Sequence, residues 1–219
     1  MNELTLVIGN YNYSSWSLRP WALMAHLGLS FTTKRIALDT PTFASEVAQV
    51  SPTACVPVLQ HGADVIWESI AILEYVSELA GGRGWPTDAK ARAHARAVSA
   101  EMHAGFSALR SAWPMNIRAR HKTTVVTDAM TSAVSRIDAI WQDCRARQAA
   151  PGPWLFGEYS AADAMYLPMV FRFNTYGATA LSPVATAYME TALSDPAITP
   201  WISAAHAEAE KIEAYEAIG

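Results

Sequence analysis

The sequence is poor in cysteine, in charge and in long apolar runs. Its two cysteines, Cys55 and Cys144, form no CxxC pair or metal-ligand spacing, so neither a zinc site nor a disulfide framework is expected. Sixteen lysines and arginines against 20 acidic residues leave no basic excess for nucleic acid. No apolar run approaches the roughly 18 residues of a membrane span, and the start MNELTLVIGN lacks the basic end of an export signal. We expect a cytoplasmic protein with no metal, nucleic-acid or membrane partner.

What is present is a globular composition that changes character along the chain. Hydrophobic residues make up 51% of the sequence and charged residues 16%, enough to build a sizeable core. The first part predicts strands at 3–9 and 30–38 with a helix over 18–27 between them, ending at Gly28. An irregular or partly helical crossover over 42–54 leads to the hairpin VPVLQHGADVIWES and then to the helix SIAILEYVSEL, which stops at two glycines.

The second part is almost entirely helical in pattern. After the glycine-rich stretch GGRGWPTD, helices are predicted over 89–112 and 123–148, a third begins near Ser160, and the tail SAAHAEAEKIEAYEAIG is typical of a solvent-facing helix. Ser160 and Asp163 form an S-x-x-D capping box that starts the third helix and carries no chemistry. The predicted fold is an α/β domain over 1–80, a linker over 81–88 and an all-α domain over 89–219.

Four short stretches occur in an order that resembles the cytosolic glutathione transferase family. They are SSWSLRPW (14–21), CVPVL (55–59), WESIAILEYV (67–76) and YSAADAMYLP (159–168). The first is close to the SSCSWR turn of the zeta class, and the chain looks most like serine-type bacterial members. The resemblance covers essentially the whole chain. It implies a thioredoxin-like N-terminal domain, a helical C-terminal domain, glutathione as co-substrate and a homodimer.

The serines of the first stretch are the expected centre of the chemistry. Proline is tolerated only near the start of a helix, so Pro20 predicts Ser17 as the N-cap and leaves Ser14 and Ser15 in the loop. Matching the zeta-like turn assigns thiolate stabilisation to Ser14, with Ser15 as the alternative or a second donor. Lowering a thiol pKa by about two units takes roughly 2.7 kcal/mol. One charge-assisted hydrogen bond contributes about 1.5–3 kcal/mol, and the helix dipole adds to it. The competing interpretation is that these serines only occupy a turn, where small polar residues are common.

The resemblance assigns glutathione-binding roles to two further stretches. Pro57 reads on its own as an edge-strand proline, whereas in the family this proline is cis and the residue before it, here Val56, pairs through its backbone with the cysteinyl part of glutathione. Ser69 and Glu68 read as a helix start, and the family uses them for the γ-glutamyl carboxylate and ammonium. Cys55 departs from the family pattern, because it replaces a long polar side chain that reaches the glycyl carboxylate.

The wall facing the electrophile is expected on the first helix of the second domain and the bend after it. The candidates are Trp16, Met102, Phe106, Trp113, Met115 and Arg118. Their apolar members also fit an ordinary core stripe. Arg110, Arg118, Arg120 and Lys122 fit either an anionic acceptor or a solvated face. The predicted function is conjugation of glutathione to a small electrophilic, mostly apolar substrate. The alternatives are a glutathione-dependent cis–trans isomerase like maleylacetoacetate isomerase, and a non-catalytic glutathione-binding protein.

Overall fold

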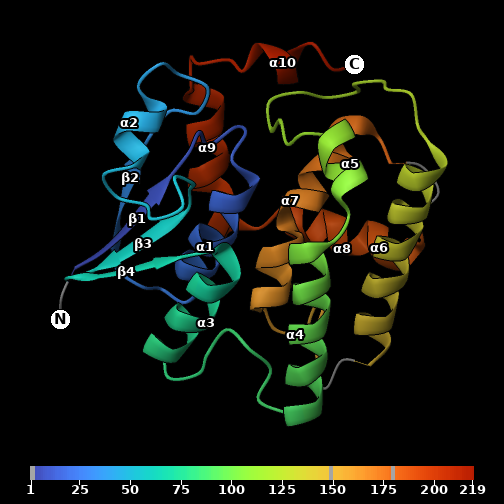
Figure 1. The fold of residues 1–219 in the computed structure, drawn as a ribbon. Helices are drawn as coiled ribbons and strands as arrows, with labels where there is room; N and C mark the ends of the chain where they lie inside the picture. Colours follow the sequence, from blue (N-terminus) through green and yellow to red (C-terminus); the bar gives the residue numbers. More distant parts are fainter. Residues whose placement is uncertain (1–2, 148–149, 179–180) are drawn as a thin grey trace.

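A four-stranded sheet organises the first part of the chain in the computed structural model, which describes residues 3–147, 150–178 and 181–219. The strands are β1 (Leu4–Ile8), β2 (Phe31–Arg35), β3 (Val58–His61) and β4 (Asp64–Trp67), in the order β2-β1-β3-β4 (Figure 1). Strand β2 pairs parallel to β1, with Leu4 opposite Phe31. Strand β3 pairs antiparallel to both β1 and β4, which confirms the predicted hairpin.

Strand β1 is buried because both faces of the sheet are covered. Leu6 and Ile8 point into the large core that continues through the helical part of the molecule. Val7, which alternates with them as strand geometry requires, packs with Val58 and Ile36 in a smaller core on the other face. The end of this central strand therefore holds the loop that follows it, residues 9–14, in a fixed position.

Helix α1 starts earlier than the sequence predicts. It spans Ser15–His26 with Ser14 at the N-cap, so the prediction of Ser17 as the N-cap is wrong. The carbonyl of Ser14 already accepts the N–H of Leu18 at 3.1 Å, and the helix tolerates Pro20 in its interior. The Ser17 hydroxyl instead accepts the backbone N–H of Gly9 at 3.2 Å, which ties the helix to the end of β1.

The remaining helices of the first part are α2 (Phe43–Val47) and α3 (Ser69–Leu79). The second part contains α4 (Ala89–Ala104), α5 (Ser107–Ala112), α6 (Asp128–Ala146), α7 (Ala161–Tyr176), α8 (Pro183–Leu193), the 3-10 turn η1 (Pro196–Ile198), α9 (Thr199–Ala207) and α10 (Glu213–Glu216). The thioredoxin-like and all-helical halves are thus as expected. The predicted helix over 89–112 is broken in two, because Phe106 adopts a left-handed conformation with φ 61°. The predicted helix over 123–148 begins only at Asp128, and its last residue lies outside the described residues.

Helix α7 is buried along almost its whole length and packs against α1 and α4. The predicted capping box at its start is confirmed: the Asp163 carboxylate accepts the backbone N–H of Ser160 at 2.8 Å. The same carboxylate accepts the N–H of Leu155 at 3.0 Å. Burial raises the pKa of Asp163 to about 6, partly opposed by these hydrogen bonds.

The C-terminal segment, residues 208–219, is not the continuous helix that its composition suggests. After α9 the chain turns back, and Figure 1 shows α10 running across the top of the view. The Glu208 carboxylate accepts the N–H groups of Tyr11 and Asn12 at 2.8 and 2.9 Å, which fastens this segment to the loop after β1. None of the described helices combines the length and apolar character needed to cross a membrane.

Candidate functional site

Two neighbouring cavities lie where the β1–α1 turn, the loop before β3 and the helical part meet. The larger has a volume of about 610 Å³ and the smaller about 260 Å³. Trp16, Cys55 and Val56 line both of them. The larger cavity is also lined by Ser14 and Ser15, and the smaller by Glu68 and Ser69. The structure therefore brings together the residues predicted to stabilise a thiolate and those predicted to bind glutathione.

The two serines differ in how their hydroxyls are used. Ser14, 5% exposed, donates its hydroxyl to the Ser17 oxygen at 2.7 Å. Ser15, 8% exposed, accepts a hydrogen bond from Nη2 of Arg172 at 3.2 Å. A hydroxyl that accepts from a guanidinium keeps its own proton available to donate. Ser15 is the first residue of α1 and not a loop residue; both hydroxyls reach the larger cavity from the helix N-terminus.

Arginine side chains gather around Trp16. The guanidinium carbon of Arg19 lies 4.0 Å from the centre of the Trp16 ring, and that of Arg110 lies 5.0 Å from it. Arg172 is fully buried, and its nitrogens donate to the Trp113 and Pro168 carbonyls as well as to Ser15. Among the described residues, no carboxylate forms an ion pair with any of these three arginines.

This clustering of like charge has electrostatic consequences. Burial, followed by repulsion from Arg172 and Arg110, lowers the pKa of Arg19 well below its usual value. Burial and the nearby Arg110 lower the pKa of Arg172 to about 10, which still leaves it charged at neutral pH. His103 packs edge-on against Trp16, and burial together with Arg19 lowers its pKa. The site is strongly positive, a setting in which an anion is favoured.

The start of α3 offers unused polar groups to the smaller cavity. Ser69 is 1% exposed, and its hydroxyl has no hydrogen-bond partner. It is the first helical residue, whereas Glu68, at φ 65°, occupies the N-cap and makes no side-chain cap bond. The Glu68 carboxylate lies 3.5 Å from Nε2 of His103. A buried hydroxyl without a partner is costly, and at a helix N-terminus it is suited to a carboxylate ligand.

The loop before β3 forms the border between the two cavities. The peptide bond from Val56 to Pro57 is cis, as the resemblance implies. Cys55 is exposed and free, and its N–H donates to the Ser51 hydroxyl at 3.2 Å. Its described neighbours on the cavity wall, Leu38, Phe43 and Ala54, bring no positive charge to this side. The described residues contain no cluster of three or more His, Cys, Asp or Glu side chains able to hold a metal ion.

The candidates for the electrophile wall fall into two groups. Trp16 and Met115 line the larger cavity. Met102 and Trp113 are buried in the core, where Trp113 stacks on Tyr176 and donates to Thr124, and Phe106 packs against the same core.

Arg118 has a different place, at the C-terminal segment. Its Nη2 donates to the Tyr13 hydroxyl at 2.8 Å and to the Glu210 carbonyl at 3.0 Å, and its Nη1 donates to the Glu208 carbonyl. Neither cavity has it among the described lining residues. This arginine joins the β1–α1 turn to the C-terminal segment.

Sequence reasoning missed several residues of the larger cavity, above all Arg172 and Tyr215. The sequence does contain a signal for Arg172. Apart from Asp163 in the first turn, Arg172 is the one charged residue of the helix AADAMYLPMVFRFNTY. No comparable signal marks Tyr215, which reaches the cavity from the C-terminal segment by way of contacts far apart in sequence.

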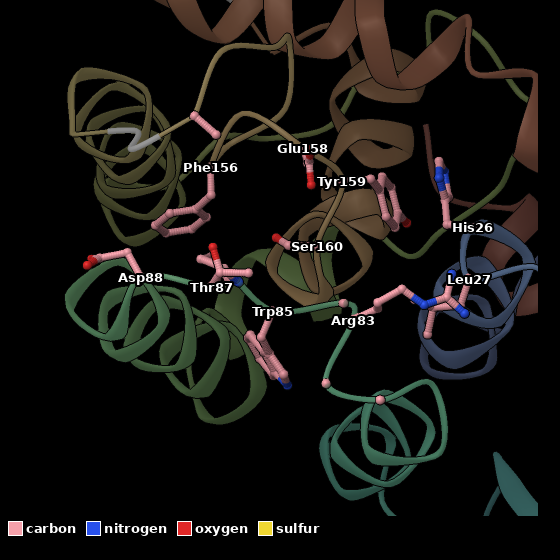
Figure 2. Close-up of a pocket in the computed structure, with 15 residues that line it drawn as sticks. His26, Leu27, Arg83, Trp85, Thr87, Asp88, Phe156, Glu158, Tyr159 and Ser160 are labelled. Carbon is pink, nitrogen blue, oxygen red and sulfur yellow. The ribbon is translucent and has the colours of Figure 1, made fainter.

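A third cavity, of about 450 Å³, lies between the end of α1, the 81–88 linker and the start of α7. Figure 2 shows His26, Arg83, Trp85 and Tyr159 among the side chains around it. The His26 ring stacks on Tyr159, and its Nε2 lies 2.6 Å from the Asp195 carboxylate. Because the N–H of Ala161 donates to the Gly84 carbonyl at 2.7 Å, the linker is fastened to α7. The described residues that line this third cavity include none of those that line the two cavities at the serines.

Individual relatives have the same architecture or a related sequence. A probable maleylacetoacetate isomerase of Caenorhabditis elegans is 32% identical over 110 residues, covering 50% of this chain and 51% of its own. Protein IN2-1 of Zea mays is 24% identical over 168 residues, 75% of this chain and 63% of its own. The chain thus spans about half to two-thirds of the length of these curated relatives. A glutathione transferase homologue from Burkholderia, solved with bound glutathione, superimposes with a TM-score of 0.69 at 23% identity, covering 95% of this chain and all of that one.

Family models give the assignment. The model described as "Glutathione S-transferase, N-terminal domain" matches residues 13–79, and that described as "Glutathione S-transferase, C-terminal domain" matches residues 91–204. Both serines, the Val56–Pro57 bond and the start of α3 lie within the first match. With its thioredoxin-like and helical halves in this order, the chain belongs to the glutathione S-transferase family.

Proposed function

We propose that the protein is an enzyme that conjugates the glutathione thiolate to a small electrophilic substrate. The observation that carries the proposal is the unpartnered, buried hydroxyl of Ser69 at the start of α3, next to the cis Val56–Pro57 bond. In this proposal Ser69 and the α3 N-terminus hold the γ-glutamyl carboxylate. Glu68 takes the ammonium, and the Val56 backbone pairs with the cysteinyl part.

This orientation directs the sulfur toward the larger cavity, where Ser14 and Ser15 lie. Ser14 donates to the thiolate once its hydroxyl rotates away from Ser17, and Ser15 acts as a second donor. Arg172, through its hydrogen bond to Ser15, polarises that hydroxyl. Hydrogen bonds that favour the charged form lower the pKa of the thiol, and the positive surroundings act in the same direction.

The reaction that follows is nucleophilic attack. The thiol proton goes to solvent, and the sulfur lone pair forms a bond to the electrophilic carbon. The electron pair of the broken bond leaves with the departing group, or for an activated double bond moves to carbon and takes a proton from water. The protein contributes positioning and charge stabilisation. Glutathione is a co-substrate, and the proposal requires no metal.

The test combines glutathione binding with a turnover assay. We expect saturable binding of glutathione by calorimetry and an ultraviolet difference signal of the thiolate at neutral pH. We also expect conjugation of 1-chloro-2,4-dinitrobenzene above the uncatalysed rate. Binding without turnover would identify a non-catalytic glutathione-binding protein of this fold, for which Cys55 is the supporting observation. Absence of binding would overturn the proposal.

A second candidate is glutathione-dependent cis–trans isomerisation. The relative from Caenorhabditis elegans that supports it bears the name probable maleylacetoacetate isomerase. In that reaction glutathione adds to the double bond, rotation follows, and the thiolate leaves again, so no net conjugate forms. Maleylacetone assayed beside the chlorodinitrobenzene separates the two, because the isomerase converts it without consuming glutathione.

We also propose a cytoplasmic homodimer. Both cysteines are free, as suits a reducing compartment, and two-fold dimers are the commonest oligomers. Trp67, Val65 and Leu79 are large apolar side chains left 42%, 38% and 44% exposed on β4 and α3, and a partner subunit would cover them. Light scattering of the wild type and of Trp67→Ser tests this; a wild type that scatters as a monomer overturns it.

A further inference from the structure

The larger cavity has more positive charge than a thiolate needs. Arg110 and Arg172 line it beside Trp16 and the two serines, and neither forms an ion pair with a carboxylate among the described residues. One thiolate balances one of these charges. Buried charges in proteins are normally paired, since an unpaired one costs several kcal/mol, so the remaining charge indicates a further anion.

The arginines also have donors to spare. Arg110 is half-buried on the cavity wall, and the hydrogen bond found for its guanidinium is one from Nη1 to the His103 carbonyl at 3.3 Å. The partners of Arg172 are two carbonyls and a hydroxyl, all neutral. A guanidinium has more N–H groups than these bonds occupy and is shaped to bind a carboxylate through two of them.

The rest of the lining agrees with an acidic ligand. The described residues around this cavity include no Asp or Glu, while Ser107 and Ser111 add hydroxyls beside Arg110. The two arginines come from α5 and α7, in the helical half, and not from the loop before β3 or the start of α3, where glutathione is proposed to lie. With glutathione placed as proposed, this side of the cavity is left for the second substrate.

We propose that the electrophile is an anion, whose carboxylate binds Arg110 and Arg172 in the larger cavity. This rests on the proposed function and names its substrate class. Arg19 lies against the Trp16 ring and is not among the described residues that line this cavity, so the proposal gives it no contact with the anion. The electrophilic carbon then lies between the carboxylate and the sulfur, and the cavity discriminates against neutral analogues of the same shape.

The test compares 4-chloro-3-nitrobenzoate with its methyl ester, which differ mainly in charge. Calorimetry without glutathione measures their binding to the wild type, Arg110→Gln and Arg110→Lys. The matched control is Arg147→Gln, which removes one positive charge at an ion pair with Asp143 at the end of α6. We expect the wild type and the control to favour the carboxylate by about tenfold to a hundredfold. Arg110→Gln should lose most of that preference and Arg110→Lys should retain part of it.

Turnover with glutathione repeats the comparison, each rate divided by the uncatalysed rate of the same compound. We expect kcat/KM for the carboxylate, relative to the ester, to fall in Arg110→Gln by the same factor as binding. Equal binding of the two compounds, or a preference untouched by Arg110→Gln, overturns the anion site. A protein that fails to bind glutathione overturns the proposed function instead, and the binding comparison still decides the anion site.

Discussion

Arg172 of α7 and Ser15 of α1 are joined by a hydrogen bond from Nη2 to Oγ of 3.2 Å, which crosses the boundary between the helical and the thioredoxin-like halves. Two further N–H groups of Arg172 donate to the Trp113 and Pro168 carbonyls. The helical half therefore lines the larger cavity and also places a guanidinium against a serine of the other half. The arrangement makes the roles of the two serines experimentally separable.

Replacing Ser14 by alanine should lower turnover by about tenfold to a hundredfold, the loss of one thiolate hydrogen bond of about 1.5–3 kcal/mol. Ser15→Ala should have a smaller effect, because it removes a second donor. Glutathione affinity should change less than kcat in both variants, and the thiol pKa, followed by ultraviolet absorbance, should rise most in Ser14→Ala. An active Ser14→Ala beside an inactive Ser15→Ala would move the main donor to Ser15. That outcome has a physical basis, because the Ser15 hydroxyl accepts from Arg172 and keeps its own proton for a hydrogen bond to the thiolate.

Replacing Ser69 by alanine should weaken glutathione binding without lowering the melting temperature. The Ser69 hydroxyl has no partner in the unliganded protein, so its removal costs no internal hydrogen bond. A capping role would instead cost about 0.5–2 kcal/mol of stability. Melting temperature and the glutathione dissociation constant are measured on the same sample, with Ser77→Ala in the same helix as a control. Unchanged affinity would remove Ser69 from the proposed γ-glutamyl site.

Replacing Arg118 by alanine should loosen the C-terminal segment, residues 208–219. The guanidinium is tied to the Glu208 and Glu210 carbonyls and to Tyr13, and these polar groups would lose their partner at a cost of about 1–3 kcal/mol. Hydrogen exchange should rise in this segment first. KM for the electrophile should also rise, because Tyr215 lines the larger cavity.

Arg120→Ala is the matched control for that variant. Its Nη1 donates to the carbonyls of Ile117 and Ala119 in its own loop, so its loss should leave the C-terminal segment protected. Equal exchange in wild type and Arg118→Ala would contradict the role assigned to Arg118.

The fold follows from the sequence wherever periodicity and end signals coincide. The hairpin around His61–Gly62–Ala63–Asp64 and the capping box of Asp163 are local, and both were predicted correctly. The predicted start of α1 is wrong. The prediction assumed that Pro20 lies within the first turn of the helix, but the hydrogen bond from the Leu18 N–H to the Ser14 carbonyl shows that the helix begins earlier. The break at Phe106 has no sequence signal stronger than the preceding Gly105.

The candidate site could be predicted only where it follows a short motif. Ser14, Ser15, Val56 and Ser69 come from contiguous stretches, and the structure brings them to two adjoining cavities. Arg172 lies more than 150 residues from Ser15 along the chain, and nothing local pairs them. The position of Tyr215 and the hydrogen-bond partners of Arg118 depend on how residues 208–219 fold back. The composition of this segment predicted a helix instead.

The buried Asp163 predicts a pH dependence of stability with a definite sign. Burial raises its pKa from 3.8 to about 6 in the folded protein, whereas the unfolded chain releases the proton near the lower value. Between these values the folded state binds more protons, so the contribution of Asp163 to stability is fully present below the unfolded pKa. This contribution is lost as the pH rises through the pKa that Asp163 has in the folded protein. The loss amounts to about 3 kcal/mol at about 1.36 kcal/mol for each pKa unit.

Asp163→Asn isolates this contribution, because asparagine does not titrate. The Leu155 and Ser160 N–H groups donate to different oxygens of the carboxylate, and asparagine keeps an acceptor for only one of them. That loss is the same at every pH, so the pH dependence of the difference still reports the titration of Asp163. Urea unfolding of both proteins at pH 4, 5, 6 and 7 gives their difference in free energy of unfolding. We expect the wild type to lose stability relative to the variant from pH 4 to 6, and the difference to stay level above that. A difference that grows in favour of the wild type as pH rises would show that the N–H donors outweigh burial. The folded carboxyl would then have a lowered pKa.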